Sequence, residues 1–136
     1  MSLSLWISKN NYEIGNSSFL KSFFSTVYIR LENEDWGSLF PIVMNDLYMG
    51  NLHYMKCDLA TEELNRIRES FKKLSPDQIV WDFEKLDNDP PWGGDINPSI
   101  DSLANYFWTS NGKNLFEVFL YAFREAKMRK TNLVIR

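Results

Sequence analysis

Three long segments of this chain carry apolar residues at intervals of three and four, a spacing that places them on one face of an α-helix. The apolar positions are Phe19, Leu20, Phe23, Phe24, Val27, Tyr28 and Leu31 in the first, Leu64, Ile67, Phe71 and Leu74 in the second, and Leu115, Val118, Phe119, Ala122, Phe123 and Ala126 in the third. These three segments are therefore predicted to be helices that each bury one apolar face.

Residues with capping side chains stand near the predicted start of each helix. We expect Ser17 or Ser18 to cap the first helix, Asp58 to cap a helix over 59–74, and Asn114 to cap the third. A shorter helix is predicted over 39–49, with Pro41 in its first turn and Gly50 just beyond its end.

Strand patterns are shorter and lie between the helices. Apolar and polar residues alternate over 2–8, which predicts a β-strand, and 133–135 predicts another. Segment 78–83 is apolar on both faces at its centre and is predicted to be an interior strand. Residues 100–107 suit a short helix, although 106–109 suit a strand equally well. Turns or loops are expected at 9–11, 15–17, 34–38 and 110–113.

This mixture of strands and helices lacks a regular βαβ repeat. It predicts an α+β fold, a single compact domain over residues 1–136 in which several helices pack on a small sheet. A chain of 136 residues is long enough to bury a sizeable core.

Composition excludes several classes of protein. The net charge of −3 gives no reason to expect direct binding to nucleic acid. Cys57 is the single cysteine, so neither an internal disulfide nor a cysteine-rich zinc site is expected. The N-terminal residues lack the features of a signal peptide, and no apolar run has the length of a membrane span. We therefore expect a cytoplasmic protein without membrane contact.

The segment from Asp77 to Asp101 has an unusual charge pattern. It contains seven acidic residues and one basic residue, Lys85. Within it, Pro90 and Pro91 restrict the backbone, and Trp92 stands where a loop normally carries small polar side chains. A stiff acidic loop with a tryptophan suits the docking of a basic partner. The alternative is that Trp92 folds back into the core, and the sequence leaves both open.

Residues for catalysis or metal binding are few. His53 and Cys57 are four apart and would form a dyad only within a helix, which Gly50 and Asn51 oppose. The same pair supplies half of a zinc site, and the acidic loop lacks the spacing of a calcium loop. We therefore predict no catalytic residues, no metal and no cofactor.

The chain resembles the immunity protein 70 family of bacterial polymorphic-toxin and contact-dependent inhibition systems. The resemblance depends on the order of several short motifs, which together cover most of the chain from Gly15 to the last helix. They are Gly15-Asn16-Ser17-Ser18-Phe19, Phe23-Phe24-Ser25-Thr26, Trp36-Gly37-Ser38-Leu39-Phe40-Pro41, Leu47-Tyr48, Val80-Trp81-Asp82, Pro90-Pro91-Trp92-Gly93 and Asn105-Tyr106-Phe107-Trp108-Thr109-Ser110-Asn111-Gly112-Lys113.

The resemblance implies an immunity protein that binds and neutralises a cognate toxin domain, with no catalysis and no cofactor. We expect a toxin of the nuclease type. Its surface would be basic, because nucleases bind the phosphates of nucleic acid. The candidate contact residues come from the charge pattern and the loop tryptophan, not from the resemblance: Asp82, Glu84, Asp87, Asp89, Trp92 and Asp95, with Glu34, Asp35 and Asp46 as a second set. The alternatives are a small enzyme that uses His53, Cys57 or the acidic loop, and a structural adaptor.

Overall fold

The four strands form one antiparallel sheet in the order β2-β1-β4-β3, in a computed structural model that describes residues 2–136. The strands are β1 (Ser2–Ile7), β2 (Asn10–Asn16), β3 (Asn51–Leu52) and β4 (Leu133–Ile135). The C-terminal β4 lies between β1 and β3, so the sheet joins the two ends of the chain. The strands predicted over 2–8 and 133–135 are confirmed, although the first ends one residue earlier, at Ile7, and the α+β class is confirmed as well.

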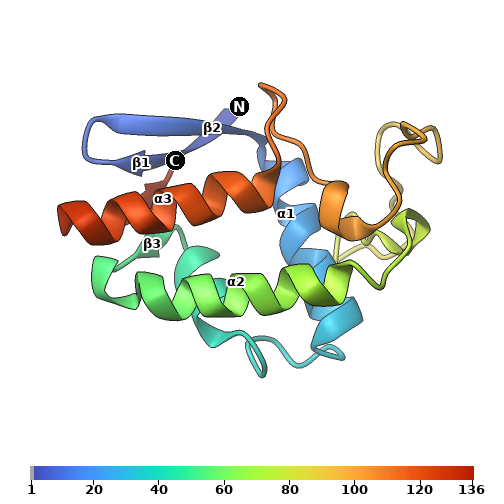
Figure 1. The fold of residues 1–136 in the computed structure, drawn as a ribbon. Coiled ribbons are helices and arrows are strands. Elements are labelled where there is room, and N and C mark those ends of the chain that lie inside the picture. The colour runs from blue at the N-terminus through green and yellow to red at the C-terminus, as the bar shows by residue number, and fades with distance from the viewer. Residues whose placement is uncertain (1) are drawn as a thin grey trace.

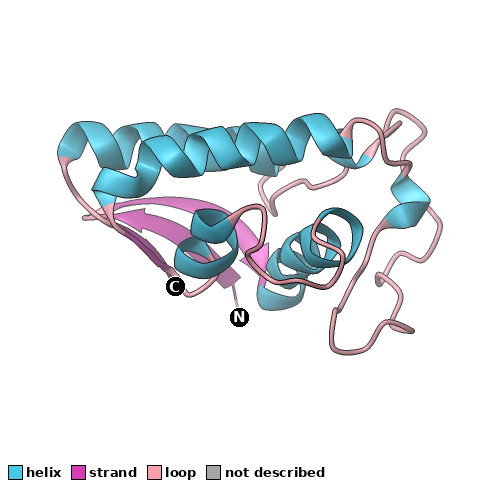
Figure 2. Ribbon diagram, turned by 90° about the horizontal axis from the view of Figure 1, so that it is seen from below, coloured by secondary structure: helices cyan, strands magenta, loops and turns pink. Residues whose placement is uncertain are grey.

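The alternation in β1 decides which face of the sheet is buried. Leu5 and Ile7 are fully buried, whereas Trp6 between them is only partly covered. Helix α3 (Leu115–Arg129) contacts β1, β2 and β4, and α2 (Cys57–Phe71) lies beside α3. Figures 1 and 2 show this pair of helices as a layer over one face of the sheet. Helix α1 (Ser17–Thr26) follows β2 directly and lies behind them (Figure 1).

The core is rich in aromatic rings. Phe23 of α1 is fully buried and contacts the rings of five other phenylalanines, at positions 24, 71, 107, 116 and 119. These rings come from α1, α2, α3 and the segment before α3. The predicted stripes of the three helices therefore meet at one point.

Short helical turns connect the main elements. The π-helical turn η1 (Val27–Leu31) continues α1, and a second π-helical turn, η2 (Ile42–Leu47), follows Pro41. Helical structure within 39–49 was predicted, and Gly50 follows it with φ of 86°. The remaining turns are 3-10 helices: η3 (Tyr54–Lys56), η4 (Pro76–Gln78) and η5 (Leu103–Asn105).

The interior strand predicted over 78–83 is wrong. Gln78 ends η4, and the residues after it run along α1 without pairing with any strand. Hydroxyl groups of α1 accept the backbone hydrogen bonds that a neighbouring strand would otherwise accept. The Val80 N–H donates to Thr26 Oγ1 at 3.1 Å, and the Phe83 N–H donates to Ser25 Oγ at 3.0 Å. The segment is apolar because it packs against a helix.

The prediction missed β2 and placed a turn at 9–11. The turn is at Ser8 and Lys9, and Ser8 has a positive φ of 56°. Polar residues dominate β2 because it is an edge strand with one exposed face, and Asn10, Asn11 and Glu13 are all exposed. Such a strand has little hydrophobic pattern to detect.

Two predicted helix caps are also wrong. Asn16, not Ser17 or Ser18, caps α1 by accepting a hydrogen bond from the Phe19 N–H at 2.8 Å. Helix α2 begins at Cys57, so Asp58 lies in its first turn instead of capping it. The predicted cap of the third helix is confirmed, since Asn114 accepts from the Phe116 N–H at 2.9 Å.

Neither the short helix predicted over 100–107 nor the strand predicted over 106–109 describes this region fully. Its only regular pieces within the described chain are the turn η5 and an isolated bridge between Trp108 and Asn114. The Asn105 side chain accepts from the Ser102 N–H at 3.2 Å and so completes a capping box around this single turn. The turn ends there because Tyr106 and Phe107 enter the core.

Candidate functional site

The acidic loop lies at the opposite end of the molecule from the β1–β2 turn (Figure 1). Asp87, Asp89 and Asp95 are exposed, and no ion pair within residues 2–136 involves any of them. Their charges are therefore not neutralised by a neighbouring side chain. This loop leaves three carboxylates available to a partner.

Trp92 holds this loop against the body of the protein. Its indole N–H donates to the Tyr106 hydroxyl at 2.8 Å, and its ring meets Trp81 edge-on at 5.2 Å between centroids. The side chain is nevertheless 40% exposed. A shallow cavity of about 500 Å³ lies beneath the loop, lined in part by Asp89, Pro90 and Trp81. Trp92 thus combines the two roles that the sequence left open: it anchors the loop and keeps part of its ring on the surface.

Asp82 and Glu84 form ion pairs, unlike Asp87, Asp89 and Asp95. Both carboxylates face Lys21 of α1, at 3.2 Å and 2.5 Å from its ammonium nitrogen. The Glu84 N–H donates to Asp82 at 2.9 Å, and together with Lys21 it lowers the pKa of the Asp82 carboxyl. These two acids fasten the start of the loop to α1, and their charge is partly offset.

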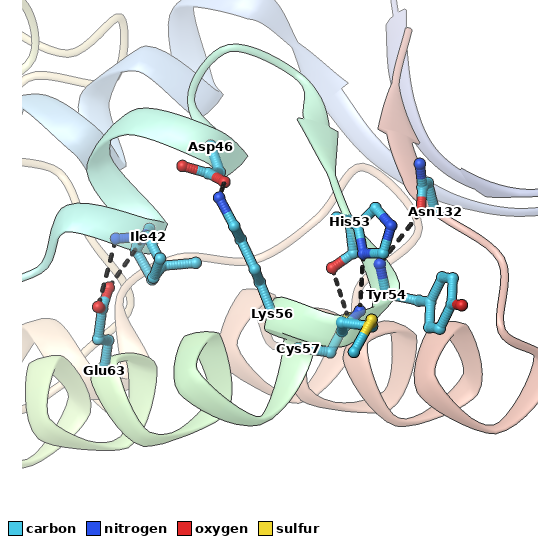
Figure 3. Close-up of polar contacts among 10 residues, drawn as sticks. Ile42, Asp46, His53, Tyr54, Lys56, Cys57, Glu63 and Asn132 are labelled. Atoms are coloured by element: carbon cyan, nitrogen blue, oxygen red, sulfur yellow. Dashed lines mark hydrogen bonds and ion pairs between the residues drawn. The ribbon is translucent and has the colours of Figure 1, made fainter.

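Glu34 and Asp35 precede Trp36, which belongs to an aromatic cluster that also contains Phe83, the residue between Asp82 and Glu84. We define this cluster by Tyr28, Trp36, Tyr48 and Phe83, whose rings contact one another. Trp36 meets the Phe83 ring at 5.2 Å, which joins the loop 33–38 to the segment 82–84. Acidic residues therefore flank the aromatic cluster from two segments that are far apart in sequence. Asp46 is placed elsewhere, in η2, and pairs with Lys56 at 2.7 Å (Figure 3).

Two buried carboxylates that the sequence analysis overlooked hold the segment 37–43 in place. Glu32 accepts hydrogen bonds from the N–H groups of residues 37, 39 and 40, at 3.0 to 3.1 Å. Glu63 of α2 accepts from the N–H groups of Ile42 and Val43 at the start of η2, at 3.2 and 2.9 Å (Figure 3). Burial raises the pKa of Glu63, and these hydrogen bonds oppose that rise. A detectable signal was that Glu63 falls between Ala60 and Ile67 on the buried face of its helix.

His53 and Cys57 do not form a nucleophile and base pair. The Cys57 Sγ lies 3.9 Å from the backbone oxygen of His53, while the imidazole Nδ1 accepts from the Met55 N–H at 3.1 Å (Figure 3). Burial raises the pKa of the Cys57 thiol to about 11, which disfavours the thiolate that a nucleophile requires. Each residue has a structural role: His53 caps η3, and Cys57 lies in the core.

Residues 2–136 contain no group of three or more His, Cys, Asp or Glu residues placed to hold a metal ion. None of their helices has the length and apolar character needed to cross a bilayer.

Comparison with known protein families decides where this chain belongs. The sequence model of the family described as Immunity protein 70 matches residues 5–135, which is nearly the whole chain. The chain belongs to the immunity protein 70 family. No curated protein and no solved structure gives a significant match. The family name suggests an immunity protein, which implies a toxin partner and a role other than catalysis.

The geometry explains several motifs that carried the resemblance to the immunity protein 70 family. In Trp36-Gly37, the indole donates to the Met44 carbonyl at 2.7 Å, while the glycine adopts a φ of 77°. A Cβ added at Gly37 would come within 2.8 Å of the Asn45 side chain. Val80 is held by Thr26 of α1. These motifs stabilise the fold, and the exposed acids lie around them.

Proposed function

We propose that this chain acts in the cytoplasm by binding a toxin domain and blocking it through protein–protein contact. The observation that carries the proposal is the set of exposed carboxylates at Asp87, Asp89 and Asp95 on a loop anchored by Trp92. A loop that is already ordered loses little conformational entropy when it binds. Membership of the immunity protein 70 family supports a toxin as the partner.

The chemistry of the loop favours a basic partner. Three exposed carboxylates that form no ion pair within residues 2–136 create a local negative field, even though the net charge of the whole chain is only −3. A toxin of the nuclease type carries a basic surface for phosphate, and complementary fields speed its encounter with such a loop. The acidic loop would therefore compete with nucleic acid, the substrate of such a toxin, for the basic residues on the toxin surface.

The acids around the aromatic cluster form the second part of this proposed contact. Glu34 and Asp35 are exposed, and the positive φ of 64° at Glu34 holds the turn in a conformation that most residues avoid. Asp82 and Glu84 are less available, because Lys21 already pairs with both. We place Asp46 outside the main contact, since Lys56 neutralises it.

The decisive experiment is co-expression with the toxin domain encoded beside the gene, followed by co-purification. Surface plasmon resonance then compares wild type with the double variant Asp87→Asn and Asp89→Asn. Steering by rim charges acts on association, so the double variant should associate more slowly and with a weaker salt dependence. A matched control, Glu62→Gln with Glu69→Gln on α2, changes the net charge equally and should leave the association rate near wild type.

Trp92 tests the anchoring role separately. Trp92→Phe keeps an aromatic ring but loses the N–H that donates to Tyr106, whereas Trp92→Ala removes the contact with Trp81 as well. Both variants should speed dissociation, and alanine should do so more strongly. If the acid variants and the Trp92 variants all fold and bind with wild-type rates, the loop is scaffold and the proposed contact is wrong.

A further inference from the structure

We infer that the free edge of β2 is a second contact for the toxin domain, which pairs with it through an extended segment. This inference rests on the proposed function and adds a named surface to it. Strand β2 lies at the end of the sheet, so one of its edges faces no other strand. An edge of this kind can add a strand from a partner.

The hydrogen bonds of β1 show which groups of β2 are free. The Ser4 N–H and C=O both bond to Arg136 beside β4, at 3.0 and 3.1 Å. In antiparallel strands these directions alternate, so Leu5 faces β2 and bonds to its register partner Tyr12. The N–H and C=O groups of Asn11 and Glu13 must then point away from the sheet, and no backbone partner for them occurs within residues 2–136.

The rest of the edge is already covered, which limits where a partner can pair. The Ser110 N–H donates to the Ile14 carbonyl at 2.9 Å, and the Ser110 hydroxyl donates to Glu13 at 2.6 Å. The 108–114 loop, orange at the top of Figure 1, therefore covers β2 beyond Glu13. The open portion is the short stretch around Asn11, Tyr12 and Glu13, enough for a few residues of an added strand.

A large surface depression begins beside this open edge. Its volume is about 1270 Å³, and it extends from β2 and the 108–114 loop over α3 to α2. This exceeds the usual size of a small-molecule pocket, which is roughly 300–1,000 Å³, and suits a segment of polypeptide. Two aromatic side chains line it with much of their surface exposed, Trp108 at 45% and Tyr121 at 59%.

The chemistry around the edge specifies the segment that it would accept. The Tyr12 ring meets Tyr121 of α3 at 5.4 Å, and a side chain opposite Tyr12 on an added strand would face the same side. An apolar or aromatic side chain fits that position. The depression has a balanced formal charge, because its lining includes three acidic residues, Glu13, Asp58 and Glu117, and three basic ones, Lys113, Arg124 and Lys127. The occupant is therefore an extended segment that is uncharged at its centre, unlike the basic surface expected at the acidic loop.

Asn11→Pro tests the backbone pairing directly. Proline removes the outward N–H and obstructs an added strand, yet it is tolerated on an edge whose N–H faces solvent. We expect this variant to keep its fold by circular dichroism and to raise the Kd for the purified toxin domain about tenfold or more. Asn11→Ala removes only the side chain and should bind within about twofold of wild type.

Hydrogen exchange on the wild-type protein gives a second test that needs no variant. The amides of Asn11 and Glu13 should exchange quickly in the free protein and become protected in the toxin complex. The Tyr12 amide should be protected in both. Unchanged exchange at Asn11 and Glu13 in a formed complex would overturn the inference, even if Asn11→Pro failed to fold.

The outcomes separate this inference from the proposed function. If the Asp87 and Asp89 variants weaken binding while Asn11→Pro does not, the acidic contact stands and the edge contact is wrong. If wild type does not bind the toxin domain at all, both fail together. If Asn11→Pro only converts a dimer into a monomer by analytical ultracentrifugation, the edge serves a second copy of this chain and the inference is overturned.

Discussion

Single buried carboxylates organise the surface that surrounds the aromatic cluster. Glu32 and Glu63 together accept from five backbone N–H groups between residues 37 and 43. Without them, those donors would lose their hydrogen bonds, and the N–H groups of the buried residues Phe40 and Val43 would be left without a partner, which destabilises a fold more than a surface change does. The Trp36 turn therefore depends on two acids that are themselves buried.

The pH dependence of stability should reveal Glu63. Its pKa is raised in the folded protein above the ordinary value of 4.5, so the folded state holds the proton more tightly. Its contribution to stability is then fully present below the unfolded pKa and decreases as pH rises through the folded pKa. Glu63→Gln should remove this slope, so the stability of the variant relative to wild type should increase as pH rises above the ordinary value of 4.5. Urea unfolding of both proteins across this range measures the difference; parallel curves would contradict it.

At the level of elements, the hydroxyl groups of α1 replace a strand partner for the segment 79–83. Thr26 Oγ1 accepts from the Val80 N–H and lies 2.8 Å from the Ser22 carbonyl, to which it can donate. The acidic loop starts from this segment, so the position of the loop depends on helix α1. A helix that supplies no candidate contact residue thus determines the geometry of the proposed contact.

Thr26→Val should loosen this attachment. Valine has nearly the same shape but cannot accept from the buried Val80 N–H, which predicts a loss of about 1–3 kcal/mol in the free energy of unfolding. Thr61→Val is the matched control, because the Thr61 hydroxyl bonds only to Cys57 within its own helix, and it should change stability by less than about 0.5 kcal/mol. Chemical denaturation measures both, and equal losses would mean that the attachment contributes nothing specific.

For the whole molecule, one aromatic core connects the sheet, the helices and the segment before α3. Phe23 stands at its centre, and its five aromatic neighbours come from four parts of the chain. Loss of that ring therefore affects every layer at once. The acidic loop and the open edge of β2 both depend on this shared core for their positions.

Phe23→Ala should lower the free energy of unfolding by about 3–5 kcal/mol, the usual cost of removing a buried phenylalanine ring. Leu86→Ala provides the comparison, because Leu86 is exposed and its loss should cost less than about 0.5 kcal/mol. Denaturant unfolding of the two variants measures both losses in the free energy of unfolding. A loss well below about 1 kcal/mol for Phe23→Ala would mean that α1 does not hold the core together.

Sequence alone determined the parts of this protein whose residues interact locally or carry a strong repeat. The stripes of α1, α2 and α3, the alternation of β1, the Asn114 cap and the short final strand follow from spacing along the chain. The acidic character of the loop was also evident, because charge is a property of composition. The order of the family motifs was enough to indicate the immunity protein 70 family.

Tertiary structure decided everything that depends on partners distant in sequence. Segment 79–83 has the composition of a strand, yet hydroxyls at Ser25 and Thr26, more than fifty residues earlier, offered its backbone a different partner. Lys21 offsets Asp82 and Glu84 but leaves Asp87 and Asp89 unpaired, a distinction that composition cannot make. The edge position of β2 arises because the C-terminal strand pairs on the opposite side of β1. Long-range pairing of this kind is a property of the folded chain, since no local pattern specifies which distant group will satisfy a given hydrogen bond or charge.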